Sequence, residues 1–299
     1  MKSRSVNFLS AILTAMFLTF EGVTLAQTSI PIYTIRHNVE RSVVSELAGN
    51  ADWGVTKLRK NVHRVMPSGV KVQLLTPKTA TLTPQQLYKD CHESALIFGK
   101  AGLCGECPDL HVVFIATATP VTEDGICFVN YHMVHPLASR DASLTKNDSI
   151  YFVADRDGQC YPLTEVLSYS TDDDAAVIRV DTRGNRLPAF PLGQPAEVGQ
   201  HVNLITHPKQ MFYTYSQGYV TRNAVYNFPD QPIIDMMEIS ADFAEGSSGG
   251  PVLDDCGNLI GMVRATTTLF HDEQNRNPQM VRKTTVPIKI LKRLLPAAK

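Results

Sequence analysis

The stretch AEGSSGGPVLDDCGNLIGMV, Ala244 to Val263, places two serines directly before a Gly-Gly-Pro sequence, and an apolar run follows soon after. Glycine, serine and proline are typical of turns, so the stretch is compatible with a simple bend between two strands. It is equally compatible with a loop that presents a serine nucleophile, because glycine adopts the positive φ values that turn backbone N–H groups toward one point. The rest of the chain has to distinguish these two interpretations.

The chain from about residue 110 onward consists of short runs rich in Val, Ile, Phe, Tyr and Thr, each bounded by Gly, Pro, Asn or Asp. These runs are LHVVFIATA, GICFVNY, SIYFVAD, AAVIRVD, HVNLITH, FYTYSQGYVT, IIDMMEIS, PVLDD and LIGMVRATTT. Many short strands separated by turn residues predict an all-β sandwich or barrel. No helix-length periodic segment lies between the runs, which disfavours a parallel α/β sheet.

Composition places few limits on function but excludes some classes. The 299 residues are 43% hydrophobic, which is enough for one or two domains with buried cores. The 28 basic and 29 acidic residues balance, and no run of like charge is present. Nothing in this balance indicates a nucleic-acid partner.

The first residues have the layout of a secretory signal peptide. Lys2 and Arg4 precede the apolar run FLSAILTAMFLTF, and GVTLAQ then ends in small residues with Ala26 as a cleavage position. The alternative is an uncleaved membrane anchor. No other segment is apolar enough to cross a membrane, so we expect residues 1–26 to be removed and the mature protein to be secreted or periplasmic, without stable membrane insertion.

Residues 27–83 form an N-terminal extension with weak signals and an open role: a propeptide, an extra layer or a partner-binding arm. The segment VERSVVSELAGN has apolar residues near helical spacing. In TPQQLYKDCHESALIFG, Thr83 is a candidate N-cap, Pro84 occupies the first helical position and Gln86 completes a capping box, which predicts a helix leading into the next domain. The final segment, VPIKILKRLLP, predicts a docked terminal helix, with a membrane-surface helix as the alternative.

The six cysteines have three competing interpretations: disulfide bonds, a zinc site and free thiols. The cysteines are Cys91, Cys104, Cys107, Cys127, Cys160 and Cys256. An even number in an exported chain favours disulfides, whose connectivity the sequence does not give. Alternatively, Cys104, Cys107 and His111, together with Cys91, provide the ligands of a tetrahedral zinc site. Disulfides are the favoured interpretation, and we expect no cofactor.

A serine nucleophile requires a base within hydrogen-bond reach, an acid that orients the base, and backbone donors for the negative oxygen that forms. GICFVNYHMVHP places His132 at the end of a strand-like run, and STDDDAAVIRV places Asp174 just before a buried-looking strand. Each residue alone is more often structural. Together with the serine loop, in the order His, Asp, Ser, they indicate nucleophilic catalysis.

These motifs resemble those of a known family. GSSGGPV looks like the nucleophile signature of chymotrypsin-like serine proteases, VNYHMV resembles the histidine motif of bacterial trypsin-like and HtrA/Deg-type peptidases, and DAAVIRV resembles their Asp-x-Ala-Val motif. Val129 and Met133 depart from the residues common in the histidine motif. The similarity covers about residues 110–293, and because the sequence after Val286 is just enough for a final helix, we expect no appended PDZ domain.

The resemblance implies an all-β, chymotrypsin-like fold of two antiparallel six-stranded β-barrels, with a partly helical N-terminal extension and a C-terminal helix. The protease domain would span 84–293, with barrel 1 at about 105–185, barrel 2 at about 186–285 and the helix at about 286–295. The active site would lie between the barrels.

The resemblance also implies roles for individual residues. Ser248 would be the nucleophile, His132 the general base and acid, and Asp174 the residue that orients the imidazole. The N–H groups of Gly246 and Ser248 would form the oxyanion hole. The neighbouring candidates Ser247, His135 and Asp173 fit the motifs less well.

Specificity and activation follow from the same comparison. Asp242 stands where trypsin-like enzymes carry the acid that binds Lys or Arg, but a structural hydrogen bond is an equally good explanation. Ala265 and Thr266 would line the substrate pocket. Ser247 occupies the position of the Asp that pairs with a new N-terminus in animal-type members, so we expect no activation of that kind, although residues 27–83 could still be inhibitory.

The predicted function is therefore an exported serine endopeptidase acting on protein or peptide substrates. Two alternatives remain: an inactive protease-fold scaffold, and a zinc-dependent hydrolase that uses the Cys/His cluster. The absence of a His-Glu-x-x-His pattern weighs against the second alternative.

Overall fold

The computed structural model describes residues 29–50, 52–107, 109–139, 149–227, 229, 233–272, 274 and 276–296. The predicted signal peptide lies outside these residues. The chain divides into two units, Met1–Ile30 and Pro31–Lys299, and every element below belongs to the second. Among the described helices, none is both long enough and apolar enough to span a bilayer.

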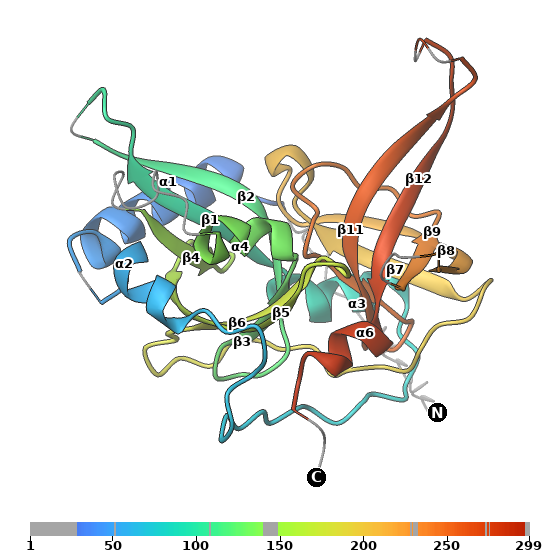
Figure 1. The fold of residues 1–299 in the computed structure, drawn as a ribbon, viewed down its shortest axis with the longest axis horizontal. Coiled ribbons are helices and arrows are strands. Elements are labelled where there is room, and N and C mark those ends of the chain that lie inside the picture. Colours follow the sequence, from blue (N-terminus) through green and yellow to red (C-terminus); the bar gives the residue numbers. More distant parts are fainter. Residues whose placement is uncertain are drawn as a thin grey trace, which may run out of the picture. The chain divides into compact units, whose positions relative to one another are not determined.

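The first barrel is a closed antiparallel sheet in the order β1-β2-β3-β6-β5-β4 (Figure 1). Its strands are β1 (Leu96–Leu103), β2 (Leu110–Pro120), β3 (Ile126–Val129), β4 (Ile150–Ala154), β5 (Cys160–Ser170) and β6 (Ala175–Val180). The barrel begins at Leu96, earlier than the expected residue 105. The segment LIFGKAGL pairs with β2 and β4 as a strand, so the expected helix ends well before it.

The second barrel is also closed, in the order β10-β11-β12-β9-β8-β7. Its strands are β7 (His201–Thr206), β8 (Thr214–Tyr226), β9 (Ile234–Ile239), β10 (Pro251–Leu253), β11 (Leu259–Phe270) and β12 (Pro278–Pro287). The outer parts of β11 and β12 form a long hairpin that projects from the barrel (Figure 1). The predicted fold class of two six-stranded antiparallel barrels is confirmed.

Short helices flank the barrels. They are α1 (Ile32–Ser42), η1 (Val43–Leu47), α2 (Val55–Leu58), η2 (Arg59–Asn61), α3 (Pro84–Cys91), η3 (His92–Ser94), α4 (Tyr131–Ala138), η4 (Pro208–Gln210) and α6 (Ile288–Arg293). Helix α3 starts with the predicted capping box, in which Thr83 Oγ1 accepts from Gln86 N–H and the Gln86 side chain accepts from Thr83 N–H. Helix α6 is the predicted terminal helix, and Ile288 and Leu291 on it are buried.

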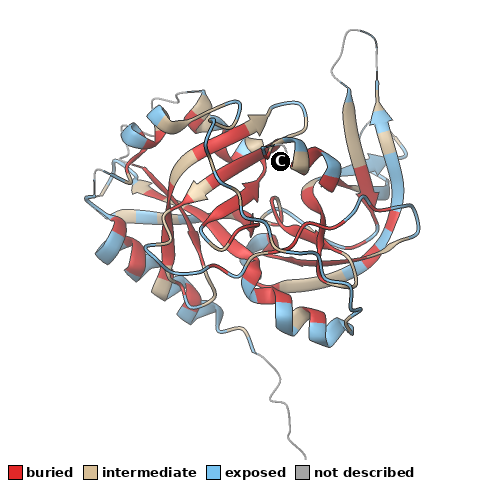
Figure 2. Ribbon diagram, turned by 90° about the horizontal axis from the view of Figure 1, so that it is seen from below, coloured by how far each residue is buried: buried red, intermediate tan, exposed pale blue. Residues whose placement is uncertain are grey.

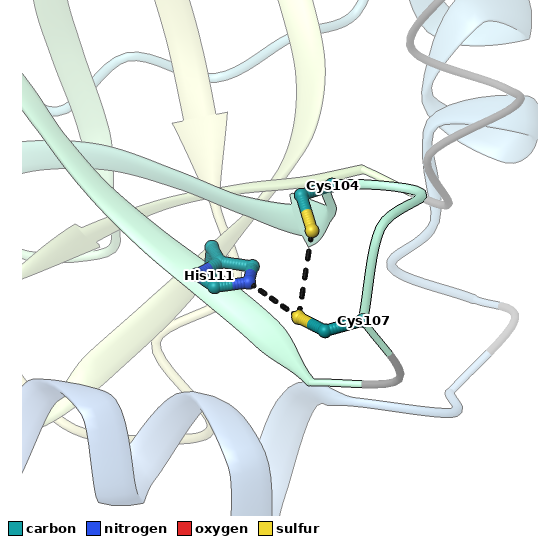
Figure 3. A group of neighbouring side chains, drawn as sticks. All are labelled: Cys104, Cys107 and His111. Carbon is teal, nitrogen blue, oxygen red and sulfur yellow. Dashed lines mark hydrogen bonds between the residues drawn. The ribbon is translucent and has the colours of Figure 1, made fainter.

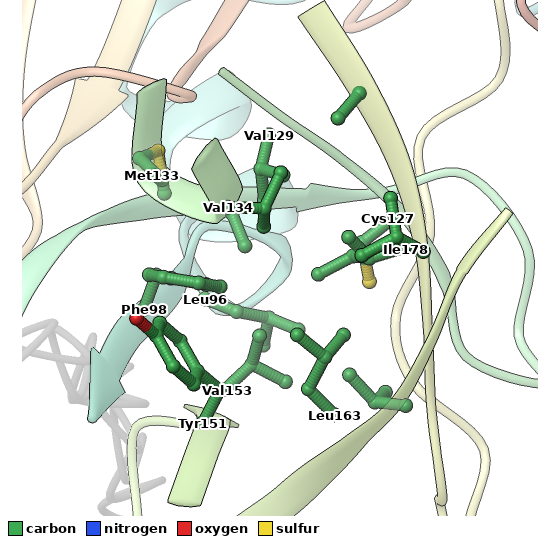
Figure 4. Packing of buried hydrophobic residues seen from close by; sticks show 14 of the residues in the cluster. Leu96, Phe98, Cys127, Val129, Met133, Val134, Tyr151, Val153, Leu163 and Ile178 are labelled. Atoms are coloured by element: carbon green, nitrogen blue, oxygen red, sulfur yellow. The ribbon is translucent and has the colours of Figure 1, made fainter. Parts of the chain in front are cut away.

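The barrel interiors are apolar, and the buried residues concentrate along their strands (Figure 2). In the first barrel, Val129 at the end of β3 and Met133 and Val134 of α4 belong to one buried cluster (Figure 4). Burial of a side chain of this size typically contributes about 1.5–3 kcal/mol. Packing of Met133 and Val134 fixes the first turn of α4. The direction of the His132 side chain in that turn is therefore fixed as well.

The N-terminal extension forms an outer layer on the barrels. Ile35, Val39, Val43 and Leu47 of α1 and η1 are buried, and Ser42 Oγ accepts from Cys160 N–H at the start of β5. Further along, the Asn258 side chain makes two hydrogen bonds with the backbone of Lys78, of 2.7 and 2.9 Å. The extension therefore packs on the first barrel and is tied to the second. Of the three roles left open, the extra layer agrees with this packing.

Candidate active site

His132 lies in the first turn of α4, immediately after β3. Its neighbours Met133 and Val134 are buried, whereas the His132 side chain is 53% exposed. The backbone N–H of His132 donates to Asp174 Oδ1 at 2.9 Å. Its ring nitrogen Nδ1 lies 3.1 Å from Asp174 Oδ1 and 3.0 Å from Oδ2. These contacts fix the imidazole on Asp174 and leave the opposite nitrogen, Nε2, facing outward.

Asp174 is held in the turn between β5 and β6 in a left-handed conformation, with a φ of 53°. Short polar residues such as Asp and Asn tolerate this conformation better than others. The backbone oxygen of Asp174 accepts from the side chain of buried Asn130 at 2.9 Å, which ties the turn to the start of α4. The Asp174 side chain is only 14% exposed. A shielded carboxylate beside an open imidazole is the arrangement that keeps Nδ1 protonated.

Ser248 lies in the tight turn that precedes β10, and that turn is fixed from both sides. The Ser248 carbonyl accepts from Thr117 N–H at 2.9 Å, and the Gly249 carbonyl accepts from Thr119 Oγ1 at 2.7 Å. On the other side, Gly249 N–H donates to Val263 O. The loop from the second barrel is thus clamped onto β2 of the first, which brings the two barrels together at the serine.

The predicted oxyanion-hole donors are available in this loop. Gly246 has a φ of +93°, and its carbonyl accepts from Thr117 Oγ1 at 3.0 Å, so this carbonyl already has a partner. Within the described residues, neither Gly246 N–H nor Ser248 N–H donates to another protein atom. Two unpaired donors in the same turn can bind one developing oxyanion.

Arg264 is a contact of this site that the sequence does not reveal. Its Nε lies 3.7 Å from Asp174 Oδ2, its guanidinium donates to Asp172 O at 3.3 Å, and its backbone oxygen accepts from Ser248 Oγ at 3.3 Å. In the sequence, Arg264 is only a charged residue at the end of an apolar run, directly before Ala265. Nothing in the sequence indicates that its partner is Asp174.

The neighbouring candidates lie outside this arrangement. Ser247 is fully buried and donates to Thr206 Oγ1 at 3.0 Å. The Asp173 carboxylate accepts from Ser170 Oγ at 2.7 Å. His135 stacks edge-on against Tyr131, one helical turn from His132. All three have structural partners of their own.

The predicted pocket residues lie on β11 and on the segment after β9. Ala265 and Thr266 are exposed on β11 and pair with Thr284 and Lys283 of β12. Asp242 is 90% exposed, and its carboxylate accepts from Lys283 Nζ at 2.5 Å. This carboxylate therefore has a partner in the structure, and the role of Asp242 in substrate binding stays a prediction.

A cavity of about 190 Å³ is lined in part by Gly246. Phe114 of β2 and Phe212 line it at an edge-to-face separation of 5.5 Å between ring centroids. Lys209 and Glu245 form an ion pair at its rim. The sequence carries no signal for this cavity beside Gly246.

The cysteines do not form the predicted four-ligand zinc set. Cys104, Cys107 and His111 come together, whereas Cys91 is buried beside Gly257 and is not part of that group. All six cysteines are free thiols in the structure. The disulfides expected from the sequence stay a prediction.

Comparisons with known proteins agree with this geometry. A family model for the trypsin-like peptidase domain matches residues 116–262. Protease Do-like 1, chloroplastic, from Arabidopsis thaliana is 31% identical over 145 residues, which are 47% of this chain and 30% of that protein. Protease Do-like 5, chloroplastic, from the same plant is 28% identical over 148 residues, which are 48% of this chain and 46% of that protein.

A solved structure described as HtrA-type protease AlgW with decapeptide superposes with a TM-score of 0.55 at 18% identity, covering 71% of this chain and 66% of that one. These matches confirm the resemblance to trypsin-like serine endopeptidases of the HtrA/Deg type. The chain spans less than half the length of each of these two curated relatives.

Proposed function

Since residues 116–262 of this chain belong to the trypsin-like peptidase domain family, we propose that the protein is an exported serine endopeptidase that cleaves peptide bonds through an acyl-enzyme. The nucleophile is Ser248, the general base and acid is His132, and Asp174 orients the imidazole. The observation that carries the proposal is the double contact of Asp174 with His132, through the backbone N–H and through Nδ1, next to a serine loop with two unpaired N–H donors.

The acylation step uses these atoms in sequence. Ser248 Oγ attacks the carbonyl carbon of the substrate while its proton passes to His132 Nε2. The carbonyl electron pair moves to oxygen, where the N–H groups of Gly246 and Ser248 stabilise it. The C–N bond then breaks, and His132 gives the proton to the leaving amine. Each oxyanion-hole donor contributes roughly 3–4 kcal/mol to transition-state stabilisation.

Deacylation repeats the sequence with water in place of the serine. Water attacks the ester carbon, His132 takes its proton, and the proton returns to Ser248 Oγ as the ester bond breaks. Asp174 stabilises the imidazolium that forms in both steps and keeps the proton on Nδ1. No metal or organic cofactor takes part in this mechanism.

The substrate is a protein or peptide. The AlgW protease, whose structure is similar to this one, is described with a decapeptide, which supports a peptide ligand for this chain too. Because Lys283 already pairs with Asp242, we infer that Asp242 does not select Lys or Arg before the cleaved bond. Export follows from the predicted signal peptide at residues 1–26.

Labelling with a fluorophosphonate probe tests the proposal directly, because the probe reacts with an activated serine. We expect one label per chain, lost in Ser248→Ala and retained in the matched control Ser247→Ala. Peptidase activity should fall by about 10⁴-fold in Asp174→Asn, as expected for a lost tautomer, while Asp173→Asn remains active.

The result that would overturn the proposal is a folded wild-type protein that neither reacts with the probe nor cleaves a peptide library. That outcome would favour the alternative of an inactive protease-fold scaffold. Activity that persists in Ser248→Ala and is abolished by a chelator would instead favour the zinc-hydrolase alternative.

A further inference from the structure

Two thiols and an imidazole converge at the tip of the β1–β2 hairpin, away from the residues of the proposed mechanism. Cys104 follows β1 directly, Cys107 lies in the connecting turn, and His111 is the second residue of β2. Figure 3 shows the three side chains directed toward one another across the hairpin. All of them are at least partly accessible to solvent.

The separations of the ligand atoms are close to those of a metal site. Cys104 Sγ and Cys107 Sγ are 3.4 Å apart, Cys107 Sγ and His111 Nε2 are 3.0 Å apart, and all three atoms lie within 4.8 Å of one another. Around a tetrahedral zinc ion with ordinary bond lengths, such atoms lie roughly 3.6–3.8 Å apart. Two of the three separations are shorter than this by a few tenths of an ångström, and the third, between Cys104 Sγ and His111 Nε2, is bounded by 4.8 Å, so the side chains at the exposed hairpin tip must readjust to admit the ion.

The backbone of the turn supports this arrangement. Glu106 N–H donates to Cys104 Sγ at 3.4 Å, a contact that favours the thiolate form needed for metal binding. Gly105 has a φ of +83° with open space around it, which lets the chain reverse between the two thiols. The Sγ–Sγ separation of 3.4 Å is well beyond the roughly 2.05 Å of a disulfide.

We propose that Cys104, Cys107 and His111 bind one zinc ion, with the fourth position open to water. Two thiolates and an imidazole are borderline-soft ligands that suit zinc and exclude the hard cations calcium and magnesium. Cys91, the fourth ligand expected from the sequence, is buried elsewhere. The site is thus a three-ligand, exposed one, which is suited to reversible binding rather than to a permanent structural role.

Binding at this position would stiffen a hairpin that is connected to the serine loop. Strand β2 carries His111 at its start, and further along it carries Thr117, whose N–H and Oγ1 donate to Ser248 O and Gly246 O. The proposed zinc site therefore lies at the start of β2, whereas the contacts with the serine loop lie further along the same strand. A bound zinc ion restrains the strand without entering the peptidase chemistry.

The test uses the full mature chain with the Ser248→Ala substitution, reduced with a phosphine, so that neither autolysis nor peptidase failure affects the result. Titration with Co²⁺ should give a near-ultraviolet thiolate charge-transfer band and visible bands of a tetrahedral site, saturating at one ion per chain and displaced by Zn²⁺. Cys107→Ser and His111→Ala should weaken binding by at least about tenfold. The matched control Cys256→Ser, whose thiol lies outside the cluster, should bind normally.

Three outcomes would overturn the proposal. The reduced protein gives no charge-transfer band, or metal binding is unchanged in Cys107→Ser and His111→Ala. In the third outcome, Cys104 and Cys107 form a disulfide, and no metal binds after that disulfide is reduced. The cobalt spectrum does not depend on peptidase activity. The metal-binding result can therefore be interpreted even if the serine-protease proposal is wrong.

Discussion

Ser248 donates its side-chain hydrogen bond to the backbone oxygen of Arg264, at 3.3 Å. The side chain of the same arginine lies 3.7 Å from Asp174 Oδ2, so one residue contacts both ends of the proposed triad. In the part of the chain that the structure describes, Ser248 Oγ makes no hydrogen bond to His132. Hydrogen bonds between catalytic groups are often long or poorly aligned in enzymes without bound substrate and tighten only in the complex with substrate.

Replacing Arg264 tests its role as a positioning residue. In Arg264→Met the backbone acceptor of Ser248 remains, but Asp174 loses an ion pair in a site where both side chains are largely shielded. We expect kcat to fall about fivefold, equivalent to about 1 kcal/mol in the barrier, with KM and thermal stability nearly unchanged. Arg264→Lys should retain most of the activity. A change in KM alone would contradict this role.

Gly246→Ala should disable the oxyanion hole. A Cβ at this position would lie 2.5 Å from His207 O, and the φ of +93° is unfavourable for alanine. The loop must shift, which moves the Gly246 donor, so we expect kcat to drop by about 10²–10³-fold. Gly184→Ala is a suitable control, because that glycine also has positive φ but has open space around it. Single-turnover kinetics and fluorophosphonate labelling would measure the effect, and full activity would show that the Gly246 N–H is not used.

The pairing of Lys283 with Asp242 predicts specificity. The wild-type protein should show no preference for Lys or Arg before the cleaved bond. Lys283→Met should leave the exposed Asp242 carboxylate without its partner and raise kcat/KM for Lys- and Arg-containing peptides by roughly three- to fivefold, the range expected for an exposed ion pair. Lys289→Met, which removes a lysine paired with Asp235, is the matched control. Strong cleavage after Lys or Arg by the wild-type protein would reject this explanation.

His207 should make the fold sensitive to acid. Burial lowers the pKa of His207 from 6.5 to about 4, and the neutral ring is fixed by donation from Nε2 to Ala95 O and by acceptance at Nδ1 from Tyr213 N–H. Because the unfolded state binds the proton first, the stabilisation is complete above about pH 6.5 and is lost as the pH falls toward 4, by roughly 3 kcal/mol at most. Denaturant unfolding at several pH values should show a smaller decrease in His207→Gln than in the exposed-histidine control His37→Gln.

Cysteine alkylation should follow the surroundings of each thiol. Donation from the backbone N–H of Glu106, and then from Cys107, lowers the pKa of Cys104 to about 7. Burial raises the pKa of Cys91 to about 11 and that of Cys160 to about 12. In reduced, metal-free protein at pH 7, iodoacetamide should therefore modify Cys104 first and leave the buried thiols intact, as measured by peptide mass mapping. Early modification of Cys160 would contradict the packing of α1 on β5.

Most of the fold is predictable from local sequence. Short β-rich runs bounded by turn residues predict the barrels, and Thr83 and Gln86 predict the start of α3, because turn and capping preferences act over a few residues. Strand β1 is not predicted in this way, since LIFGKAGL is a short apolar run whose strand character depends on pairing with β2 and β4. A short apolar segment does not reveal its hydrogen-bond partners.

The sequence by itself determined the identities and order of His132, Asp174 and Ser248, because motif residues with local turn requirements are visible along the chain. Only the tertiary structure decided which side chains lie together. Arg264 lies beside Asp174, Lys283 pairs with Asp242, and His111 lies beside two thiols but not beside Cys91. Such contacts depend on the register of strands distant in the sequence, and a shift of one residue would send each side chain to the opposite face of its sheet.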